Sequence, residues 1–371
     1  MMIKMPIDHI LQALKQVTSD TTPYSMHPTF YTNDDFLEEE IEQLFIPGWI
    51  CVGRADRIAN IHDYFVIEIL GESLIITRNA DNSISALSNV CRHRGSIIAS
   101  GEGSAKKFTC PYHHWSYAQD GSLIRAPLID EQEGFDKKIC KLPSFKTEIW
   151  MGWIFVNLSN DAPPLLSAIK PIDEFAKNYH NEEMVSIQTT DEIWATNWKC
   201  LGENFLEGYH LTPVHLTTLH PMCPTRLCEK IEGNNAFTGY KAHYVEDYEG
   251  RVETHPDMSE EQKRLSQMLW IYPGFVVAMS PNSSVWISLL PEDADHVRLH
   301  WGVIGRPEII GTDEADARWN FANEFNAEDR ARLEDVQKGL KSRFAKSGPL
   351  APKDYEGTVM DFYTYVCNKM T

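Results

Sequence analysis

The chain has 371 residues, of which 43% are hydrophobic and 23% charged, and this is ordinary for a globular protein with room for two cores. Its formal net charge of −19 argues against nucleic acid and against anionic membrane surfaces as partners, because both repel it. The sequence has no run of 18 apolar residues, and residues 1–17 lack the continuous apolar core that is typical of a signal peptide. We do not expect its eight cysteines to form a disulfide framework in a chain this long. We therefore expect a cytoplasmic protein.

The pattern of apolar residues changes twice along the chain. Residues 1–46 are expected to form helices, because residues 1–17 are amphipathic and residues 32–45 begin with a capping Asn33 and an acidic first turn. Residues 47–158 show short apolar or alternating runs separated by turn residues, which predicts a small all-β domain. After a Pro-rich link, residues 159–371 alternate helices with longer strands. We expect an α+β protein in these three parts, with the N-terminal helices packed on the third.

Two short loops of the β domain carry the most specific pattern. Cys91 and His93 form a C-x-H unit, and Cys110 and His113 form a C-x2-H unit. Two thiolates on one iron and two imidazoles on the other describe a Rieske [2Fe–2S] centre. A structural zinc site with the same ligands is the alternative, although the spacing is not that of zinc fingers. His114 lies in the same loop, but the C-x2-H spacing favours His113.

A second group of carboxylates and imidazoles lies farther along the chain. On a continuous helix Glu203, Glu207 and His210 fall at i, i+4 and i+7 and share one face. Pro213 is expected to end or kink this helix, so that His215 turns back toward the group. Two imidazoles with one carboxylate are typical of a non-haem Fe(II) site. A pair of ordinary histidines is the alternative.

Together the two patterns resemble the oxygenase (α) subunits of the Rieske non-haem iron oxygenases, also called aromatic-ring-hydroxylating oxygenases, over nearly the whole chain. The resemblance implies a small Rieske domain and a catalytic domain with an antiparallel sheet and covering helices, a helix-grip or START-like fold. It places the cluster on Cys91, His93, Cys110 and His113. It places a mononuclear Fe(II) on His210, His215 and Asp329.

Asp329 is assigned only through the resemblance. In the family the carboxylate ligand stands at the start of a helix that reads E/D-D-x4-E-x-x-Q, which here corresponds to Glu328, Asp329, Glu334 and Gln337. From the residues alone, Asp329 also fits a simple helix cap, since Asn326-x-x-Asp329 resembles a capping box.

Glu207 departs from the commonest family pattern. Most members have an Asp at this position, which bridges a cluster histidine of one subunit to an iron histidine of the next. A carboxylate there can orient His210 and provide a hydrogen-bonded path for an electron. Members that oxidise carnitine also have Glu, so Glu207 favours that branch.

The resemblance implies a terminal oxygenase that hydroxylates a small organic substrate with O2. The chain lacks a G-x-G-x-x-G fingerprint, so a separate NAD(P)H-dependent flavin and iron–sulfur reductase is expected to supply electrons. A homotrimer is expected, in which the cluster of one subunit serves the iron of its neighbour. A Rieske electron carrier without catalysis is the alternative from another class, and it needs no second iron site.

The favoured substrate is a quaternary-ammonium zwitterion of the carnitine or betaine kind, which would undergo C–N cleavage or demethylation. Hydroxylation or dihydroxylation of an aromatic acid or ring is the alternative. An aromatic cage suits a quaternary ammonium group, and a flat apolar slot suits a ring. The aromatic candidates are Phe237, Trp270, Tyr272, Phe275, Trp286 and Trp301. The candidates for pairing with a carboxylate are Arg226, Lys230, Arg251 and Arg298.

Overall fold

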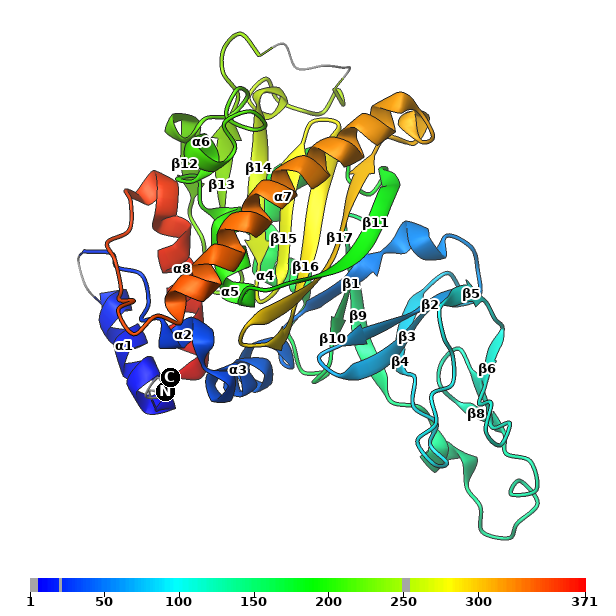
Figure 1. Ribbon diagram of the computed structural model, residues 1–371. Helices are drawn as coiled ribbons and strands as arrows, with labels where there is room; N and C mark the ends of the chain where they lie inside the picture. The colour runs from blue at the N-terminus through cyan, green and yellow to red at the C-terminus, as the bar shows by residue number, and fades with distance from the viewer. Residues whose placement is uncertain (1–5, 20–21, 249–253) are drawn as a thin grey trace. The chain divides into compact units, whose positions relative to one another are not determined.

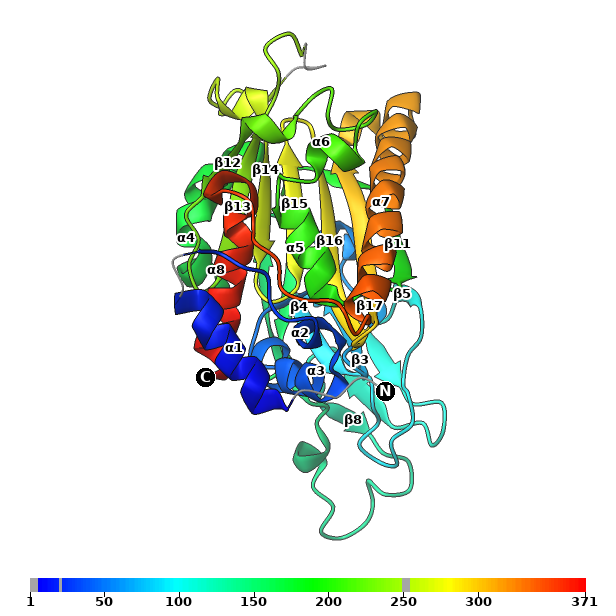
Figure 2. The same ribbon diagram turned by 60° about the vertical axis from the view of Figure 1, so that its left-hand side comes forward.

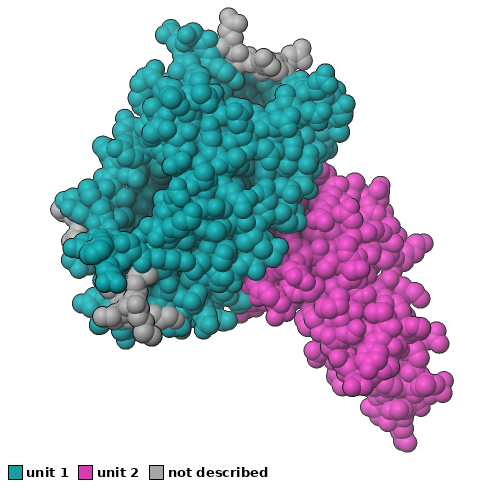
Figure 3. Space-filling view, viewed as in Figure 1, with its two compact units in different colours: residues 1–50, 163–371 teal, residues 51–162 magenta. Residues whose placement is uncertain are grey.

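The computed structural model describes residues 6–19, 22–248 and 254–371. It divides the chain into a smaller unit, residues 51–162, and a larger unit, residues 1–50 with 163–371 (Figure 3). The boundaries expected near residues 47 and 158 each lie a few residues before these. The predicted fold class is confirmed, because one unit is built almost entirely of strands and the other combines an antiparallel sheet with helices.

The smaller unit contains a seven-stranded sheet and a three-stranded sheet. The larger sheet has the order β1 (Ile50–Arg54), β10 (Trp153–Asn157), β9 (Ser144–Trp150), β4 (Ile84–Ser88), β3 (Glu72–Arg78), β2 (Asp63–Ile69) and β5 (Glu102–Ser104). The smaller sheet consists of β6 (Lys107–Thr109), β7 (Ser116–Ala118) and β8 (Leu123–Arg125). Strands β9 and β10 are joined by a tight turn in which Met151 and Gly152 have φ of 48° and 83°.

The larger unit is built on one seven-stranded antiparallel sheet. Its order is β11 (Val185–Trp194), β17 (His296–Gly305), β16 (Ser283–Asp293), β15 (Phe275–Ser280), β14 (Leu265–Ile271), β13 (Phe237–His243) and β12 (Cys228–Ile231). The central strands are rich in Val, Ile, Leu and Trp and are buried along most of their length. Such near-continuous apolar strands indicate a sheet that is covered by other elements rather than open to water.

Eight α-helices are described in the larger unit. They are α1 (Ile7–Ser19), α2 (Thr29–Thr32), α3 (Asp34–Glu40), α4 (Leu165–Ala176), α5 (Trp198–Leu206), α6 (Leu211–Val214), α7 (Asp313–Leu340) and α8 (Lys353–Met370). The expected cap at Asn33 is present, since its side chain accepts the N–H of Phe36 at 3.1 Å. The last turn of that helical segment, Ile41–Phe45, is a π-helix.

Three helices lie side by side over one face of the larger sheet. Figures 1 and 2 show α5 between α7 and α8, with the strands behind them. Gly202 lets α5 approach the sheet closely, because a Cβ at this position would lie 2.4 Å from the ring of Trp270. The end of α5 is thereby fixed between α7 and α8, where the second group of predicted site residues follows it in the chain.

Candidate metal centres

The two Cys–His loops of the smaller unit have the same backbone turn. In each, the cysteine carbonyl accepts the N–H of the residue four positions later, at 3.0 Å from Gly95 to Cys91 and at 3.0 Å from His114 to Cys110. Gly95 and His114 are both left-handed, with φ of 75° and 59°. His114 therefore occupies the turn position that glycine fills in the other loop, and His113 is the neighbour that lies against His93.

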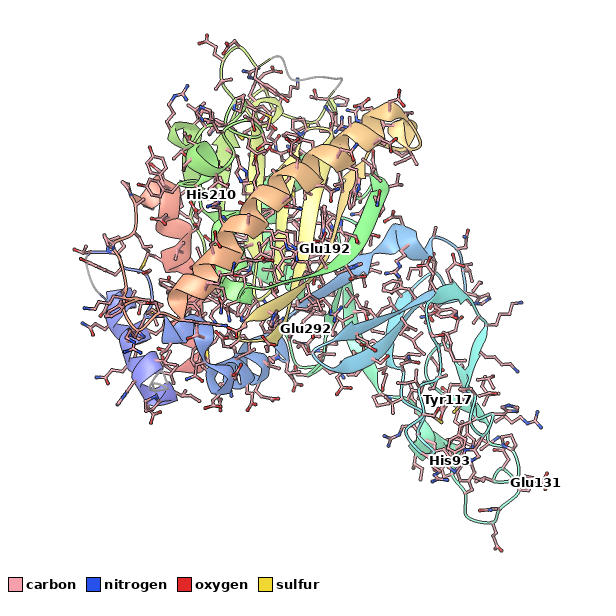
Figure 4. All side chains as sticks on the ribbon, viewed as in Figure 1. His93, Tyr117, Glu131, Glu192, His210 and Glu292 are labelled. Atoms are coloured by element: carbon pink, nitrogen blue, oxygen red, sulfur yellow. The ribbon has the colours of Figure 1, made fainter. Side chains whose placement is uncertain are left out.

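The thiols lie inside these loops and the imidazoles lie nearer to the surface. Cys91 and Cys110 are buried, whereas His113 is exposed and His93 half-buried. The Nδ1 atoms of the two histidines are 3.1 Å apart, and their rings cross at 73°. The hydroxyl of Tyr117 lies 3.2 Å from Cys91 Sγ. Figure 4 shows His93 and Tyr117 close together at one end of the smaller unit.

The local electrostatics act in opposite directions on the two thiols. Burial raises the pKa of the Cys91 thiol above its ordinary value. Burial also raises the pKa of the Cys110 thiol, but hydrogen bonds from the backbone N–H groups of Tyr112 and His113 and from side chains together lower it more, so this pKa lies below its ordinary value. Desolvation and the neighbouring His93 and Arg94 lower the pKa of His113. A thiolate and a neutral imidazole are the protonation states that a metal requires.

One zinc ion does not fit all four side chains. Within the described ranges, only two groups of three or more His, Cys, Asp or Glu have ligand atoms that all lie within 4.8 Å of one another, and neither contains Cys91 or Cys110. Tetrahedral zinc would hold its ligands within about 4 Å of each other, because its bonds to S and N are only about 2.0–2.3 Å long. The wider arrangement fits a two-iron cluster with thiolates on one iron and imidazoles on the other.

The chain leaves the helical path earlier than expected in the larger unit. Helix α5 ends at Leu206, so the prediction of a helix that continues to Pro213 is wrong. Two groups of α8 end it: the hydroxyl of Thr358 donates to the Leu206 carbonyl at 2.6 Å, and the Tyr355 carbonyl accepts the N–H of Gly208 at 2.9 Å. Pro213 lies inside the separate short helix α6, and it is not the residue that ends α5.

The predicted convergence of Glu203 with the other site residues is also wrong, because the shared helix face no longer exists. The Glu203 carboxylate accepts the hydroxyl of Tyr31 at 3.0 and 3.1 Å. That hydroxyl lies 2.7 Å from the hydroxyl of Tyr363. Burial raises the pKa of Glu203 to about 8.

Glu207 and His210 meet through a turn instead of a helix. Glu207 Oε1 lies 2.7 Å from His210 Nδ1, and Glu207 Oε2 accepts the backbone N–H groups of Tyr209 and of His210, the latter at 3.1 Å. The carboxylate therefore holds both the turn that precedes α6 and the imidazole of His210. Burial lowers the pKa of His210, but Glu207 and Asp329 raise it more, to about 9. Figure 4 shows His210 beside α6.

His210, His215 and Asp329 come together as predicted, and all their ligand atoms lie within 4.8 Å of one another. Asp329 Oδ1 is 3.5 Å from His210 Nε2 and 3.1 Å from His215 Nε2. The two rings are 5.1 Å apart and cross at 68°. Asp329 does not start a helix, because α7 begins at Asp313 and Asn326 is buried within it rather than capping it.

This group fits a cation. His215 Nε2 and Asp329 Oδ1 are buried and neither has a hydrogen-bond partner. His215 Nδ1 lies 2.7 Å from Glu328 Oε2, so the ring proton belongs on that side and Nε2 presents a lone pair to the carboxylate. Two acceptors facing each other in a buried site are stabilised by a metal ion between them. Glu328 was missed from the sequence, although it directly precedes Asp329 in the quoted motif.

The second group within 4.8 Å contains His180, His255 and Asp257, but its rings do not fit a shared ion. The two imidazoles lie against each other, with centroids 3.6 Å apart and planes tilted by 33°. Lone pairs lie in the plane of the ring, so two rings in face-to-face contact direct few of their lone pairs at one shared point. The Nδ1 of His255 also accepts the N–H of Asp257 at 3.2 Å.

A cavity of about 140 Å³ lies near the His210 group, since Leu211 is part of its lining, although His210, His215 and Asp329 are not among its described lining residues. Arg318, Ala322 and Phe325 line it from one face of α7, and Asp329 continues that face at the i, i+4, i+7 and i+11 spacing. The ring of Phe325 meets the ring of His215 edge-on, with centroids 6.3 Å apart.

The aromatic prediction for this cavity is wrong. None of the six predicted aromatic residues is among its described lining, and all six are at most 5% exposed in the core. Its rings come from Phe205, Tyr240, Phe321 and Phe325 instead.

The predicted cationic residues that the structure describes do not line the cavity either. Lys230 pairs with Asp361 at 2.7 Å and Arg298 pairs with Glu292. Arg226 is exposed to solvent. Arg251 lies outside the described residues.

Comparison with known proteins identifies both parts of the chain. Residues 48–146 match the Rieske [2Fe-2S] domain, and residues 175–371, just over half the chain, match the ring hydroxylating alpha subunit (catalytic domain). The chain belongs to the ring-hydroxylating oxygenase α-subunit family. The predicted cofactors are thereby confirmed as a Rieske [2Fe–2S] cluster and a mononuclear iron, as is the expected enzyme class, a Rieske non-haem iron oxygenase.

This oxygenase subunit is similar to proteins with named substrates. It is 29% identical to the carnitine monooxygenase oxygenase subunit of Acinetobacter pittii (strain PHEA-2), over 85% of this chain and 84% of the relative. It is 25% identical to the glycine betaine monooxygenase oxygenase subunit of Pseudomonas aeruginosa (strain UCBPP-PA14), over 94% and 89%. A solved quaternary ammonium Rieske monooxygenase, described with carnitine oxidation and inter-subunit electron transfer, is 25% identical, with a TM-score of 0.84 over 100% of both chains. No helix within the described residues is long and apolar enough to cross a membrane.

Proposed function

We propose that this subunit is the terminal oxygenase of a system that acts on a quaternary-ammonium zwitterion of the carnitine or betaine kind. The reaction is hydroxylation next to the nitrogen, followed by C–N cleavage or loss of a methyl group. A separate NAD(P)H-dependent flavin and iron–sulfur reductase supplies the electrons. The observation that carries the substrate proposal is the lining of the cavity beside His215.

Four aromatic rings and no acidic side chain are among the described residues that line this cavity. A quaternary ammonium group is attracted to the face of such a ring, by roughly 0.5–2 kcal/mol per contact. The polar groups of the lining include the hydroxyls of Ser266, Ser280 and Ser283 and the guanidinium of Arg318, which also pairs with Glu314 at 2.6 Å. A molecule with a cationic head and an anionic tail matches both kinds of surface. The named substrates of the similar carnitine and betaine enzymes support the same class.

The site assignments are part of this proposal. We assign the cluster to Cys91, His93, Cys110 and His113. We assign the mononuclear iron to His210, His215 and Asp329. When bound, the iron supplies the activation of O2 and the cluster supplies electrons to it.

The protein's own groups hold these ligands and exclude water. Glu207 fixes His210 through Nδ1 at 2.7 Å, so that Nε2 faces Asp329. Phe325, which lines the cavity, also packs edge-on against the ring of His215, and the His215 side chain is only 1% exposed, so the protein shields this ligand from solvent. We further propose a homotrimer in which Glu207 connects His210 to the cluster of a neighbouring subunit, in line with the inter-subunit electron transfer described for the similar solved enzyme.

A single turnover tests the substrate. Both centres are reduced chemically, O2 is added with one candidate substrate at a time, and the products are identified by mass spectrometry. Formaldehyde or a cleaved amine from carnitine, γ-butyrobetaine or glycine betaine is expected. An oxygenated ring from an aromatic acid, with quaternary ammonium compounds left intact, would overturn the proposal and make the subunit an aromatic hydroxylase.

Iron analysis tests whether the subunit is more than an electron carrier. The purified protein should hold about three irons per chain, two in the [2Fe–2S] cluster and one mononuclear. Asp329→Ala should lose about one iron and keep its acid-labile sulfide. Two irons in the unaltered chain, with no change in Asp329→Ala, would show a carrier instead.

A further inference from the structure

The imidazole of His215 is held from two sides by consecutive residues of α7. Glu328 Oε2 lies 2.7 Å from His215 Nδ1, and Asp329 Oδ1 lies 3.1 Å from His215 Nε2. Consecutive residues of a helix project about 100° apart, so they reach different edges of a ring that lies across the helix. One short stretch of α7 therefore provides both the iron carboxylate and the group that orients a second ligand.

Glu328 is itself held in place. The hydroxyl of Thr218 donates to Glu328 Oε2 at 2.6 Å, so the oxygen that faces His215 receives two hydrogen bonds. Thr218 follows His215 by three residues, and its N–H donates to the His215 carbonyl at 3.2 Å. The loop after α6 and the middle of α7 are thereby joined through one carboxylate oxygen. The side chain of His215 is only 1% exposed, so water does not replace this partner from the solvent side.

The arrangement selects one form of His215. A carboxylate accepts hydrogen bonds and does not donate them, so the partner atom Nδ1 carries the ring proton. In the neutral ring Nε2 is then a free acceptor, and this buried atom has no hydrogen-bond partner, like Asp329 Oδ1 opposite it. A metal ligand histidine generally donates its other N–H to a carboxylate, which fixes the ring and makes the ligand more basic.

We propose that Glu328 is the positioning residue that fixes the tautomer and orientation of His215 for the mononuclear iron. This inference rests on the proposed iron site. His210 is held in the same way by Glu207, but Glu207 lies in the chain only three residues from its histidine, whereas Glu328 comes from a different element. The orientations of the two imidazoles are thus fixed by different carboxylates. Loss of Glu328 should therefore change the orientation of His215 and leave that of His210 unchanged.

The test measures metal binding and not turnover. Chains stripped of mononuclear metal are titrated with Co²⁺, and the affinity, the visible spectrum and the hyperfine-shifted Nδ1–H signals are recorded for the unaltered chain, Glu328→Ala and Glu328→Gln. Glu328→Ala should bind Co²⁺ 10–100-fold more weakly, as is typical when such a partner is removed. It should also lose one of the two Nδ1–H signals to exchange with water. Glu328→Gln keeps an acceptor oxygen and should show a smaller loss.

Glu334→Gln is the matched control. Glu334 lies on the same helix with a similar exposure, 28% against 26%, but it pairs with Arg330 at 2.8 Å and should leave the site unchanged. The Rieske electron paramagnetic resonance signal should be the same in all variants. Unaltered affinity and both Nδ1–H signals in Glu328→Ala would overturn the inference, and if that variant does not fold, the same result in Glu328→Gln would do so. Failure of the unaltered chain to bind Co²⁺ at His210 and His215 would instead contradict the iron site itself.

Discussion

Glu207 holds His210 at 2.7 Å although the two residues do not share a helix. Helix α5 ends at Leu206, and the carboxylate then serves as the cap of the next turn through two backbone N–H groups. The Glu207 side chain is consequently fixed at three points and is 13% exposed. The Glu207 carboxylate can therefore pass a change in its own hydrogen bonding to the His210 imidazole while its side chain stays in place.

The first prediction concerns the coupling of the two metal centres. Glu207→Gln should keep both centres, because no ligand is removed, but should slow oxidation of the cluster by O2 and substrate by about 10–100-fold. The reason is that an uncharged amide orients His210 less firmly and weakens the hydrogen-bonded path. The rate is measured by stopped-flow absorbance of the cluster after chemical reduction.

A surface pair of the same chemistry provides the control. Glu229 lies 3.1 Å from His243 Nε2 and is 58% exposed, so Glu229→Gln should leave the rate of cluster oxidation unchanged. A rate in Glu207→Gln close to that of the unaltered chain would show that Glu207 does not connect the centres.

The cysteine and histidine candidates could be predicted from the sequence because each pair has a short local spacing, whereas Asp329 could be assigned only through the family resemblance. Cys91 with His93 and Cys110 with His113 each lie within one loop, so a short motif carries the geometry. The end of α5 could not be predicted in this way. It is set by Thr358 of α8, which is 152 residues from Leu206 in the chain. A helix pattern that continues to Pro213 is locally consistent, and only tertiary contacts show where it stops.

The cavity aromatics were not predictable because strand faces depend on register. Phe237 and Tyr240 are three residues apart on β13, so they point to opposite faces, and only Tyr240 lines the cavity. Trp286 and its neighbour Val285 differ in the same way on β16, and Val285 is the one that lines the cavity. Residue type alone does not show which side chains of a strand lie on the face of the sheet that the helices cover.

The second prediction tests the cavity as the substrate site. Ala242 lines it and is 3% exposed, so Ala242→Leu would place three more carbon atoms in a space of about 140 Å³. Turnover of the preferred substrate should fall more than about tenfold. The free energy of unfolding should change by less than about 1.5 kcal/mol, because the added atoms enter existing space. Ala317→Leu, at an exposed position of α7, is the control and should change neither quantity.

The third prediction concerns how closely α5 lies against the sheet. In Gly202→Ala the new Cβ would lie 2.4 Å from the ring of Trp270, so either the helix or the ring must move. The expected loss is about 1–3 kcal/mol of unfolding free energy, measured by urea denaturation. Gly339→Ala is the matched control, because it is also helical and has no atom within 4 Å of the added Cβ. It should be neutral or stabilising by up to about 1 kcal/mol. Equal stability of the two variants would show that α5 has room to shift.

The fourth prediction follows from the buried carboxyl of Glu203. Burial raises its pKa from 4.5 to about 8 in the folded chain. Between these two values the unfolded chain has lost the proton while the folded chain still holds it. The contribution of Glu203 to the free energy of unfolding therefore falls as pH rises from about 4.5 to about 8, by at most roughly 1.4 kcal/mol per pH unit.

Glu203→Gln removes this titration, so its stability relative to the unaltered chain should rise across the same interval and become constant above about pH 8. Urea denaturation at a series of pH values measures the difference. Glu334→Gln should behave in the opposite sense, because the hydrogen bond from Arg330 lowers the pKa of Glu334 and its stabilising contribution is lost as pH falls. A difference for Glu203→Gln that does not vary between about pH 5 and pH 8 would mean that Glu203 ionises normally, and that its hydrogen bond from Tyr31 compensates fully for burial.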